Sequence, residues 1–373
     1  MKKYFAFGLM LLAGGLFGYF LGTFILVKDP NSVPVPTYLK LLTVGIALFS
    51  GFLMIAWHEL GHLIGGWAVR FRFQMYVVGP LLWMREGQKI VFKWNKNLNI
   101  FGGLALSLPQ DTQNLTQRFL WTVAGGPLAS LAGGMLFLAI YYGGFGQVTA
   151  ANPWAYFAGS VFFINGWMSL GLFLVSALPY HAGGFFSDGA RILNMLSGGI
   201  KARREAIILS IISQSTSGIR PRDLSQSLLE EGLSVSEEWK VKPYIHYYLY
   251  LAALDKQDIA TAAQHLDIYS DYVSEMPEAY RGTVYFENAF FKSYFLKDVA
   301  GAQDCLNKAK PCAIIPKHLI YKAEAALSWA QGHWEDASQK AALALAELPK
   351  SMDKGTAVAE QEWLLAIQQA VPS

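Results

Sequence analysis

Four runs of apolar residues in the first half of the chain are each long enough to cross a lipid bilayer. A transmembrane helix needs about 20 consecutive apolar residues, and the runs that meet this length are Tyr4–Val27, Tyr38–Val69, Phe119–Tyr142 and Trp154–Leu178. A cleaved signal peptide is the alternative for the first run, but its apolar core is too long and no small-residue cleavage site follows it. The pattern therefore predicts four membrane-spanning helices.

Polar and apolar residues alternate in two short stretches between the second and third runs. These stretches are 70–78 and 89–94, and a period of two is typical of β-strands. Residues typical of turns lie between the two stretches, at 79–80 and 86–87. We expect a small β-hairpin here, which either covers the neighbouring helices as a scaffold or holds an extended peptide by strand addition.

The last third of the chain reads as helices in pairs. Similar segments recur at offsets of 40 and 35 residues, at 258–266, 298–306 and 333–341. An aromatic- and alanine-rich stretch precedes each of them, at 241–254, 279–295 and 317–331. This pattern resembles a degenerate tetratricopeptide array of about three repeats.

Such an array implies a protein-binding domain, because arrays of this kind bind partners through their concave face. A final helix at 355–370 is expected to cap the array, and a helix at 202–214 has a basic start that suits a membrane surface. A lone helical bundle without a ligand is the alternative.

Composition separates the same two regions. Hydrophobic residues make up 53% of the 373 residues and charged residues only 15%, against about 25% charged residues in an ordinary soluble protein. Residues 1–200 hold 12 Lys and Arg against 5 Asp and Glu, whereas residues 201–373 hold 18 against 22. Because the basic excess lies beside apolar runs, we expect a lipid bilayer and no nucleic acid as its partner.

The expected fold is therefore mainly α-helical. It comprises a membrane-embedded bundle of four spans with a small β-hairpin over 1–200, a linker with an interfacial helix over 201–240, and a soluble tetratricopeptide-like domain over 241–373. The segment 70–118 holds seven Lys or Arg, whereas 28–37 holds one and 143–153 holds none. By the positive-inside rule, we expect a multi-pass protein of the plasma membrane, bacterial in type, with both termini cytoplasmic.

Between Leu41 and Val69, in the second apolar run, only three residues are ionisable: His58, Glu59 and His62. His58 and His62 are four residues apart, so on a helix they share one face and can bind one metal ion. Glu59 lies beside them, within reach of a metal-bound water as a general base. Ionisable residues at membrane depth are costly and are functional by default, so a chance occurrence of this pattern is disfavoured.

Zinc held by two imidazoles needs a further protein ligand. The acids that remain in residues 1–200 are Asp29, Glu86, Asp111 and Asp188, and the only other histidine there is His181. Asp188 follows the fourth run on the same side of the membrane as the two histidines, and is the favoured ligand. Its alternative role is the N-cap of a helix at 189–197, and the alternative for His181 is a polar residue at the membrane interface.

These motifs together resemble the site-2 protease family of intramembrane zinc metalloproteases. The features that carry the resemblance are H-E-L-G-H at 58–62, A-G-G-P-L-A-S at 124–130, and Pro179 followed by Asp188 and Gly189. The resemblance implies that His58, His62 and Asp188 bind Zn2+ and that Glu59 activates water.

The chain departs from the family pattern where that family has asparagines. Ser176 and Ser130 stand at these positions. Asn165, in the fourth run, is a candidate replacement, and its alternative role is a hydrogen bond between helices.

The expected activity is that of a zinc metalloendopeptidase that cleaves a membrane-embedded protein or peptide. The alternative is a membrane-anchored helical-repeat adaptor with a vestigial metal site. A metal transporter is disfavoured, because the spans carry one set of ligands and no chain of carboxylates. Glu59 favours the enzyme, since a vestigial site does not need a general base.

Overall fold

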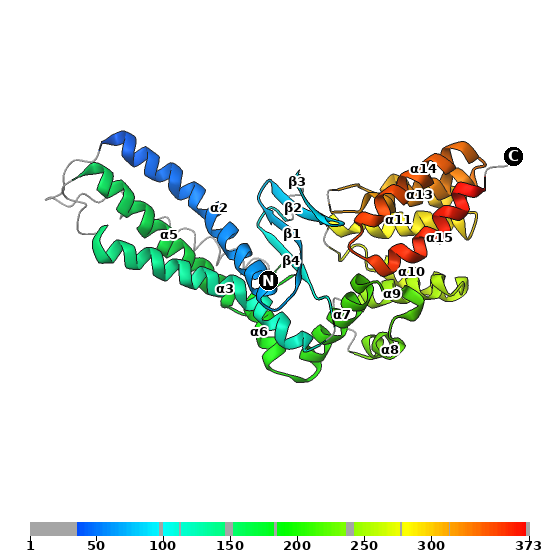
Figure 1. Cartoon of the computed structure of the whole chain (residues 1–373), viewed down its shortest axis with the longest axis horizontal. Coiled ribbons are helices and arrows are strands. Elements are labelled where there is room, and N and C mark those ends of the chain that lie inside the picture. The colour runs from blue at the N-terminus through cyan, green and yellow to red at the C-terminus, as the bar shows by residue number, and fades with distance from the viewer. Residues whose placement is uncertain are drawn as a thin grey trace. The chain divides into compact units, whose positions relative to one another are not determined.

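The computed structural model describes residues 36–96, 100–111, 113–145, 152–182, 185–235, 242–276, 278–312 and 314–370. Within these ranges three helices are long and apolar enough to cross a membrane: α2 (Thr37–Ala68), α3 (Leu115–Ile140, continued by the π-helical turn η2, Tyr141–Phe145) and α5 (Pro153–Ala177) (Figure 1). They occupy the positions of the second, third and fourth predicted spans. The first predicted span, Tyr4–Val27, lies outside the described residues.

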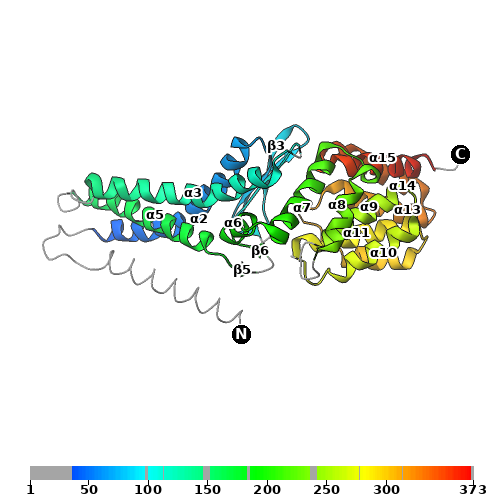
Figure 2. The ribbon, with the colours of Figure 1, turned by 90° about the horizontal axis from the view of Figure 1, so that it is seen from below.

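Small residues let α3 and α5 pack closely. A Cβ added at Gly134 would lie 2.6 Å from the side chain of Leu170, and one added at Gly166 would lie 2.7 Å from the side chain of Leu138. Glycine at these points allows the two backbones to approach. Close packing at small residues is the usual way in which apolar helices associate in lipid, because lipid provides no hydrophobic driving force between them. The helices α2, α3 and α5 run side by side in Figures 1 and 2.

Contacts divide the chain into two compact units. The first joins Met1–His58 to Pro127–Val175, and the second joins Glu59–Gly126 to Ser176–Ser373. The β-sheet belongs to the same unit as the helical tail.

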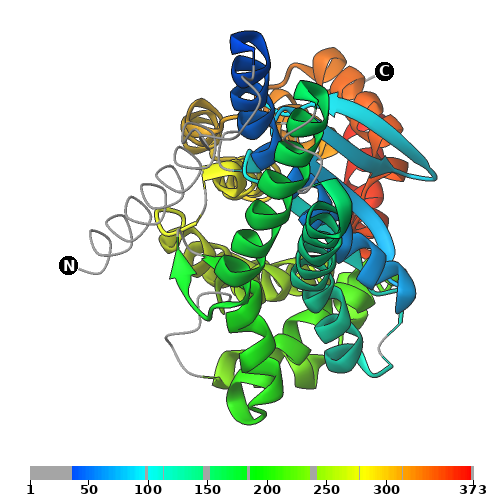
Figure 3. The same ribbon diagram turned by 90° about the vertical axis from the view of Figure 1, so that its left-hand side faces the viewer.

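The predicted β-hairpin is a four-stranded antiparallel sheet. Its strands are β1 (Arg72–Val78), β2 (Leu81–Glu86), β3 (Lys89–Trp94) and β4 (Leu104–Leu108), in the order β3-β2-β1-β4. The strands are labelled in Figure 1 and appear as blue and cyan arrows in Figure 3. The two stretches with alternating polarity correspond to β1 and β3, but they do not pair with each other, since β2 lies between them. The hairpin prediction was too small because β2 and β4 lack strict alternation.

One face of the sheet packs against the helical tail. Met75, Val77, Leu82 and Met84 form a buried cluster with Ile314, which precedes α13. These side chains alternate along β1 and β2, as a half-buried strand requires. The packing explains why the sheet and the tail form one compact unit.

The tail consists of helical pairs at the expected places. The tail begins with α7 (Gly199–Ser217), the short helix η3 (Pro221–Asp223) and α8 (Gln226–Ser234). Three pairs of helices follow: α9 (Lys242–Asp255) with α10 (Ile259–Asp271), α11 (Glu278–Tyr294) with α12 (Val299–Lys308), and α13 (Lys317–Ala330) with α14 (Trp334–Glu347). Ala262, Ala302 and Ala337 are fully buried in the second helix of each pair. Small side chains there allow the paired helices to pack closely.

The final helix, α15 (Lys354–Gln369), follows the short helix η4 (Leu348–Lys350) and contacts more than the last pair. Its N-cap, Asp353, accepts a hydrogen bond from Ser215 of α7. Trp363 packs against Phe290 of α11, with ring centroids 5.5 Å apart. Glu362 of α15 forms an ion pair with Arg220, the residue that precedes η3. The helix therefore joins the beginning of the tail to its end.

A buried ion cluster links the inner helices. The ammonium of Lys322 in α13 is fully buried, lies 3.1 Å from both carboxylate oxygens of Glu287 in α11, and donates to Glu360 in α15. Burial disfavours a charged lysine, but the two carboxylates hold the pKa of Lys322 above its ordinary value. Removing one member of such a cluster leaves the others charged and buried.

We expect Lys322→Met to lower the free energy of unfolding of the tail by about 3–5 kcal/mol, because Glu287 and Glu360 would lose their shared cation. Pulse proteolysis of the full-length protein in detergent, along a urea series, measures this change. The matched control is Lys308→Met: Lys308 is exposed and pairs with Asp304 four residues away, which predicts a far smaller loss, because a solvent-exposed ion pair contributes little to stability. Equal losses for the two variants would contradict a structural role for the cluster.

Candidate metal centre

The centre is built on the last turns of α2. His58 and His62 project from one face of this helix, one turn apart. His58 is buried, with an exposed fraction of 6%, and Glu59 next to it is half-buried. The helix therefore presents two imidazoles and a carboxylate within an otherwise apolar segment.

Each imidazole uses Nδ1 for a contact with α3. Nδ1 of His58 lies 2.9 Å from the hydroxyl of Ser130, and Nδ1 of His62 lies 3.0 Å from the carbonyl oxygen of Thr122. A histidine that donates from Nδ1 keeps its lone pair on Nε2, which is the form that binds a metal. The contacts leave Nε2 of both side chains as ligand atoms.

The main-chain N–H of Gly126 lies 3.3 Å from the same Nδ1 of His62. A given tautomer of His62 can either accept this N–H or donate to Thr122, but not both. Metal binding through Nε2 selects the bond to Thr122.

Glycines bring α2 and α3 into backbone contact at this point. A Cβ added at Gly125 would lie 2.2 Å from the carbonyl oxygen of Gly61, and one added at Gly65 would lie 2.6 Å from that of Trp121. No larger residue fits at either position without moving a backbone. This explains the glycine at position 125 of the 124–130 motif and the glycine at position 65.

The third side chain reaches the centre from the turn after α5. Asp188 opens α6 (Asp188–Leu196), and the hydroxyl of Ser187 caps that helix by accepting from the N–H of Ala190. The same hydroxyl donates to the carbonyl of Leu178, 2.6 Å away. Ser187 therefore fixes the start of α6 to the end of α5.

Gly189 fixes the turn from the other side. A Cβ added there would lie 1.8 Å from the carbonyl oxygen of Ala177, so only glycine fits. The alternative prediction, in which Asp188 is the N-cap of 189–197, is wrong, because Ser187 holds that position. The carboxylate of Asp188 is consequently not committed to capping.

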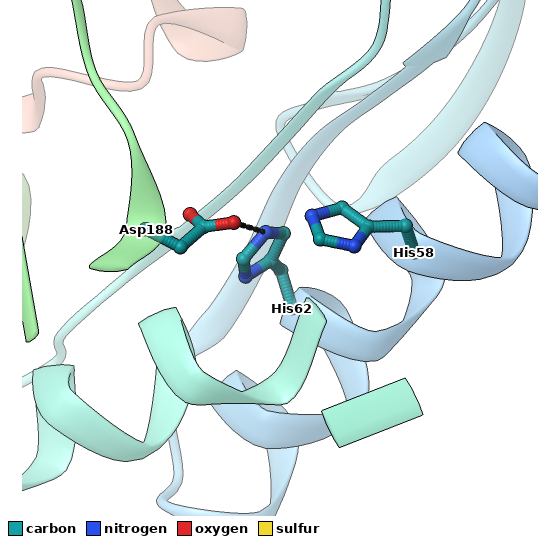
Figure 4. Close-up of side chains that lie close together, drawn as sticks. All are labelled: His58, His62 and Asp188. Atoms are coloured by element: carbon teal, nitrogen blue, oxygen red, sulfur yellow. Dashed lines mark ion pairs between the residues drawn. The ribbon is translucent and has the colours of Figure 1, made fainter. Parts of the chain in front are cut away.

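The three side chains converge, as Figure 4 shows: the carboxylate of Asp188 points toward the ring of His62, with His58 on the adjoining turn. One ligand atom from each residue can be chosen so that all lie within 4.8 Å of one another. Nε2 of His62 and Oδ2 of Asp188 are 3.5 Å apart. Tetrahedral zinc with bonds of about 2.1 Å places neighbouring ligand atoms roughly 3.4 Å apart, so this donor set fits zinc.

The sheet reaches the neighbourhood of Glu59. Tyr76 of β1 is half-buried, and burial together with the charge of Glu59 raises the pKa of its phenol to about 12. The hydroxyl is therefore a neutral hydrogen-bonding group beside the carboxylate at physiological pH. Burial and the charge of Asp188 likewise raise the pKa of Tyr180.

The other sequence candidates lie on α5 or shortly after it. His181 lies in the short strand β5 (His181–Ala182), which pairs with β6 (Phe185–Phe186). Asn165 donates to the carbonyl of Val161 on its own helix, 2.8 Å away, rather than between helices. Ser176 is buried near the end of α5.

Sequence reasoning missed the residues that hold the ligands in place. Ser130 was seen only as a replacement for asparagine, and Thr122 and Ser187 were not singled out. The available signal was spacing: Thr122, Gly126 and Ser130 recur every four residues, which places them on one face of a helix.

We expect purified protein to bind one zinc ion per chain, and His62→Ala and Asp188→Ala to lose most of it, because each removes one of three protein ligands. Metal analysis of the detergent-purified variants provides the measurement. His181→Ala serves as the control and should retain the metal. Normal zinc in Asp188→Ala, or loss of zinc in His181→Ala, would overturn the ligand assignment.

Comparison with known proteins gives no match to any family model, any curated protein or any solved structure.

Proposed function

We propose that the protein is an intramembrane zinc metalloprotease that cleaves a membrane-embedded protein or peptide. The observation that carries this proposal is the convergence of His58, His62 and Asp188 beside Glu59, on a helix that is otherwise apolar. Two imidazoles and one carboxylate are a donor set of hydrolytic zinc sites, which keep a further position open. A purely structural zinc site has four protein ligands.

Zinc in such a site lowers the pKa of a bound water to about 7 and polarises the carbonyl under attack. Glu59 supplies the proton transfers: its carboxylate accepts a proton from the attacking water and returns it to the nitrogen of the departing amine. Glu59 follows His58 on α2 and is not one of the clustered ligands. His58, His62 and Asp188 hold the metal, and the contacts on Nδ1 keep the two rings oriented.

The substrate must be extended before it is cut, because a helix hides its peptide bonds in internal hydrogen bonds. The strand β4 lies next to α2: a Cβ added at Gly66 would be 3.0 Å from the side chain of Ser107. Among the described strands, β4 pairs only with β1 and forms one edge of the sheet. We propose that this edge binds the unwound substrate by strand addition.

Water reaches the centre from the side on which α2 ends. That end is held by Arg118, whose guanidinium donates to the carbonyl of Val69, 2.9 Å away, and Arg70 follows the helix directly. Basic residues mark the cytoplasmic side of a membrane protein. The site therefore opens toward the cytoplasm, and both termini lie on that side.

A membrane-anchored adaptor with a vestigial metal site is the second candidate. Its support is the array of helical pairs from α9 to α14, an architecture that commonly binds proteins. This candidate leaves the position of Glu59 beside the ligands without a purpose.

We expect Glu59→Gln to keep zinc near the wild-type amount but to lose cleavage by several orders of magnitude, because the amide cannot accept the proton of the attacking water. Co-expression with candidate single-span proteins, scored by the appearance of a shortened product, measures turnover. Metal analysis of the same preparation reports on the site.

Cleavage at the wild-type rate by Glu59→Gln would refute the mechanism. Zinc lost together with cleavage would instead give Glu59 a role in holding the metal. Glu86→Gln is the matched control: Glu86 is an acid of β2 that pairs with Lys93, and its replacement should leave both zinc and cleavage unchanged.

The orientation is tested separately. A reporter fused after Ser373 should be active only if it functions in the cytoplasm, because the positive-inside rule places the segment 70–118 and both termini there. Alkaline phosphatase and green fluorescent protein fusions give opposite readouts. An active phosphatase fusion would overturn the four-span topology with cytoplasmic termini.

A further inference from the structure

We propose that Ser130 is a positioning residue of the metal centre: its hydroxyl accepts a hydrogen bond from Nδ1–H of His58 and thereby directs Nε2 of that ring toward the metal. The inference rests on the proposed zinc site and adds a residue to it.

The contact has the geometry of a hydrogen bond that orients a metal-binding histidine. The Ser130 side chain is completely buried, with an exposed fraction of 0%, and its Oγ lies 2.9 Å from Nδ1 of His58. A buried hydroxyl in an apolar helix needs a hydrogen-bond partner, and this imidazole supplies one. In return the contact fixes the orientation of the ring, and a metal on Nε2 would select the tautomer in which Nδ1 donates to this hydroxyl.

The turn of α3 that carries Ser130 is itself anchored. Ser169 of α5 donates to the carbonyl oxygen of Ser130, 2.7 Å away, and the indole N–H of Trp57 donates to the carbonyl of Ala129, also 2.7 Å away. Two helices therefore hold this turn through hydrogen bonds to its backbone. The position of the hydroxyl is set before any metal binds.

Close packing of α2 against α3 explains why a short side chain stands here. The backbones of α2 and α3 are in contact at Gly61 and Gly125, so the distance between the two helices is still short about one turn further along, at Ser130. A serine hydroxyl reaches the imidazole across this distance, whereas an asparagine side chain is longer by one heavy atom. The departure from the asparagine of the family pattern is accordingly a change of function at this position.

The other histidine differs in a way that makes the proposal testable. Nδ1 of His62 contacts the main-chain carbonyl of Thr122, which no side-chain substitution removes. The contact of His58 is to a side chain, so Ser130→Ala deletes it and changes nothing else of substance. The variant removes one oxygen and adds no bulk.

The test measures cobalt and zinc binding to the metal-free, full-length protein in detergent. We expect Ser130→Ala to weaken metal affinity by about 10–100-fold, the usual cost of removing a hydrogen bond that orients a ligand. We also expect its visible absorption with bound Co2+ to differ from that of the wild type, because the His58 ring is no longer fixed. The metal-free variant should remain folded, with a melting temperature lowered only as far as the loss of one buried hydrogen bond requires.

Ser160→Ala is the matched control. Ser160 is buried in α5, with an exposed fraction of 1%, and its hydroxyl donates to Tyr156 on its own helix, 2.8 Å away. Its replacement should leave affinity and spectrum unchanged. Wild-type affinity and spectrum in Ser130→Ala would overturn the inference, as would equal weakening in both serine variants or unfolding of metal-free Ser130→Ala. Wild-type protein that binds neither metal would overturn the proposed function itself, which separates the two failures.

Discussion

The structure depends on one constraint: the polar groups of an apolar helix must find partners without water. His58, Glu59 and His62 lie in α2, where unpaired polar groups are costly. The helix α3 supplies partners from a single face, through the Ser130 hydroxyl and the Thr122 carbonyl. That supply is available only because Gly61 and Gly125 let the backbones touch. The glycines and the imidazoles therefore belong to one arrangement.

The same constraint governs the arrival of Asp188. A carboxylate that lies next to an apolar helix must be placed accurately, and two small residues fix the turn that carries it. The hydroxyl of Ser187 donates to the carbonyl of Leu178, and Gly189 lets the turn lie against the backbone of Ala177. The negative charge then lies beside His62. A carboxylate and two neutral imidazoles leave one positive charge on a divalent cation, which suits a Lewis acid that must attract a carbonyl oxygen.

The sequence predicted whatever depends on local spacing. The placement of His58 and His62 on one face of α2, the three apolar helices and the paired helices of the tail follow from periods of 3.6 residues and from length. The sheet was underestimated because β4 is a short apolar run, and its place at an edge depends on pairing with β1. The N-cap at Ser187 rather than Asp188 is a shift of one residue that capping preferences cannot resolve, since both types cap well.

Long-range contacts explain the remaining differences. The expected cap of the repeat array, α15, instead contacts α7 and α11 through Asp353 and Trp363, which no periodicity encodes. The contact between Ser130 and His58 spans 72 residues and becomes visible only when α2 and α3 are brought together. The chemistry of the ligands was readable from the sequence, but the groups that hold them were not.

The most direct test of this account is X-ray absorption at the zinc edge of the purified, full-length protein. The account predicts a first shell of nitrogen and oxygen only, at about 2.0–2.2 Å, with the outer-shell scattering of two imidazoles. Asp188→Ala should lose the metal or change this shell. Sulfur scattering at about 2.3 Å, or a spectrum without imidazole features, would contradict a centre formed by His58, His62 and Asp188.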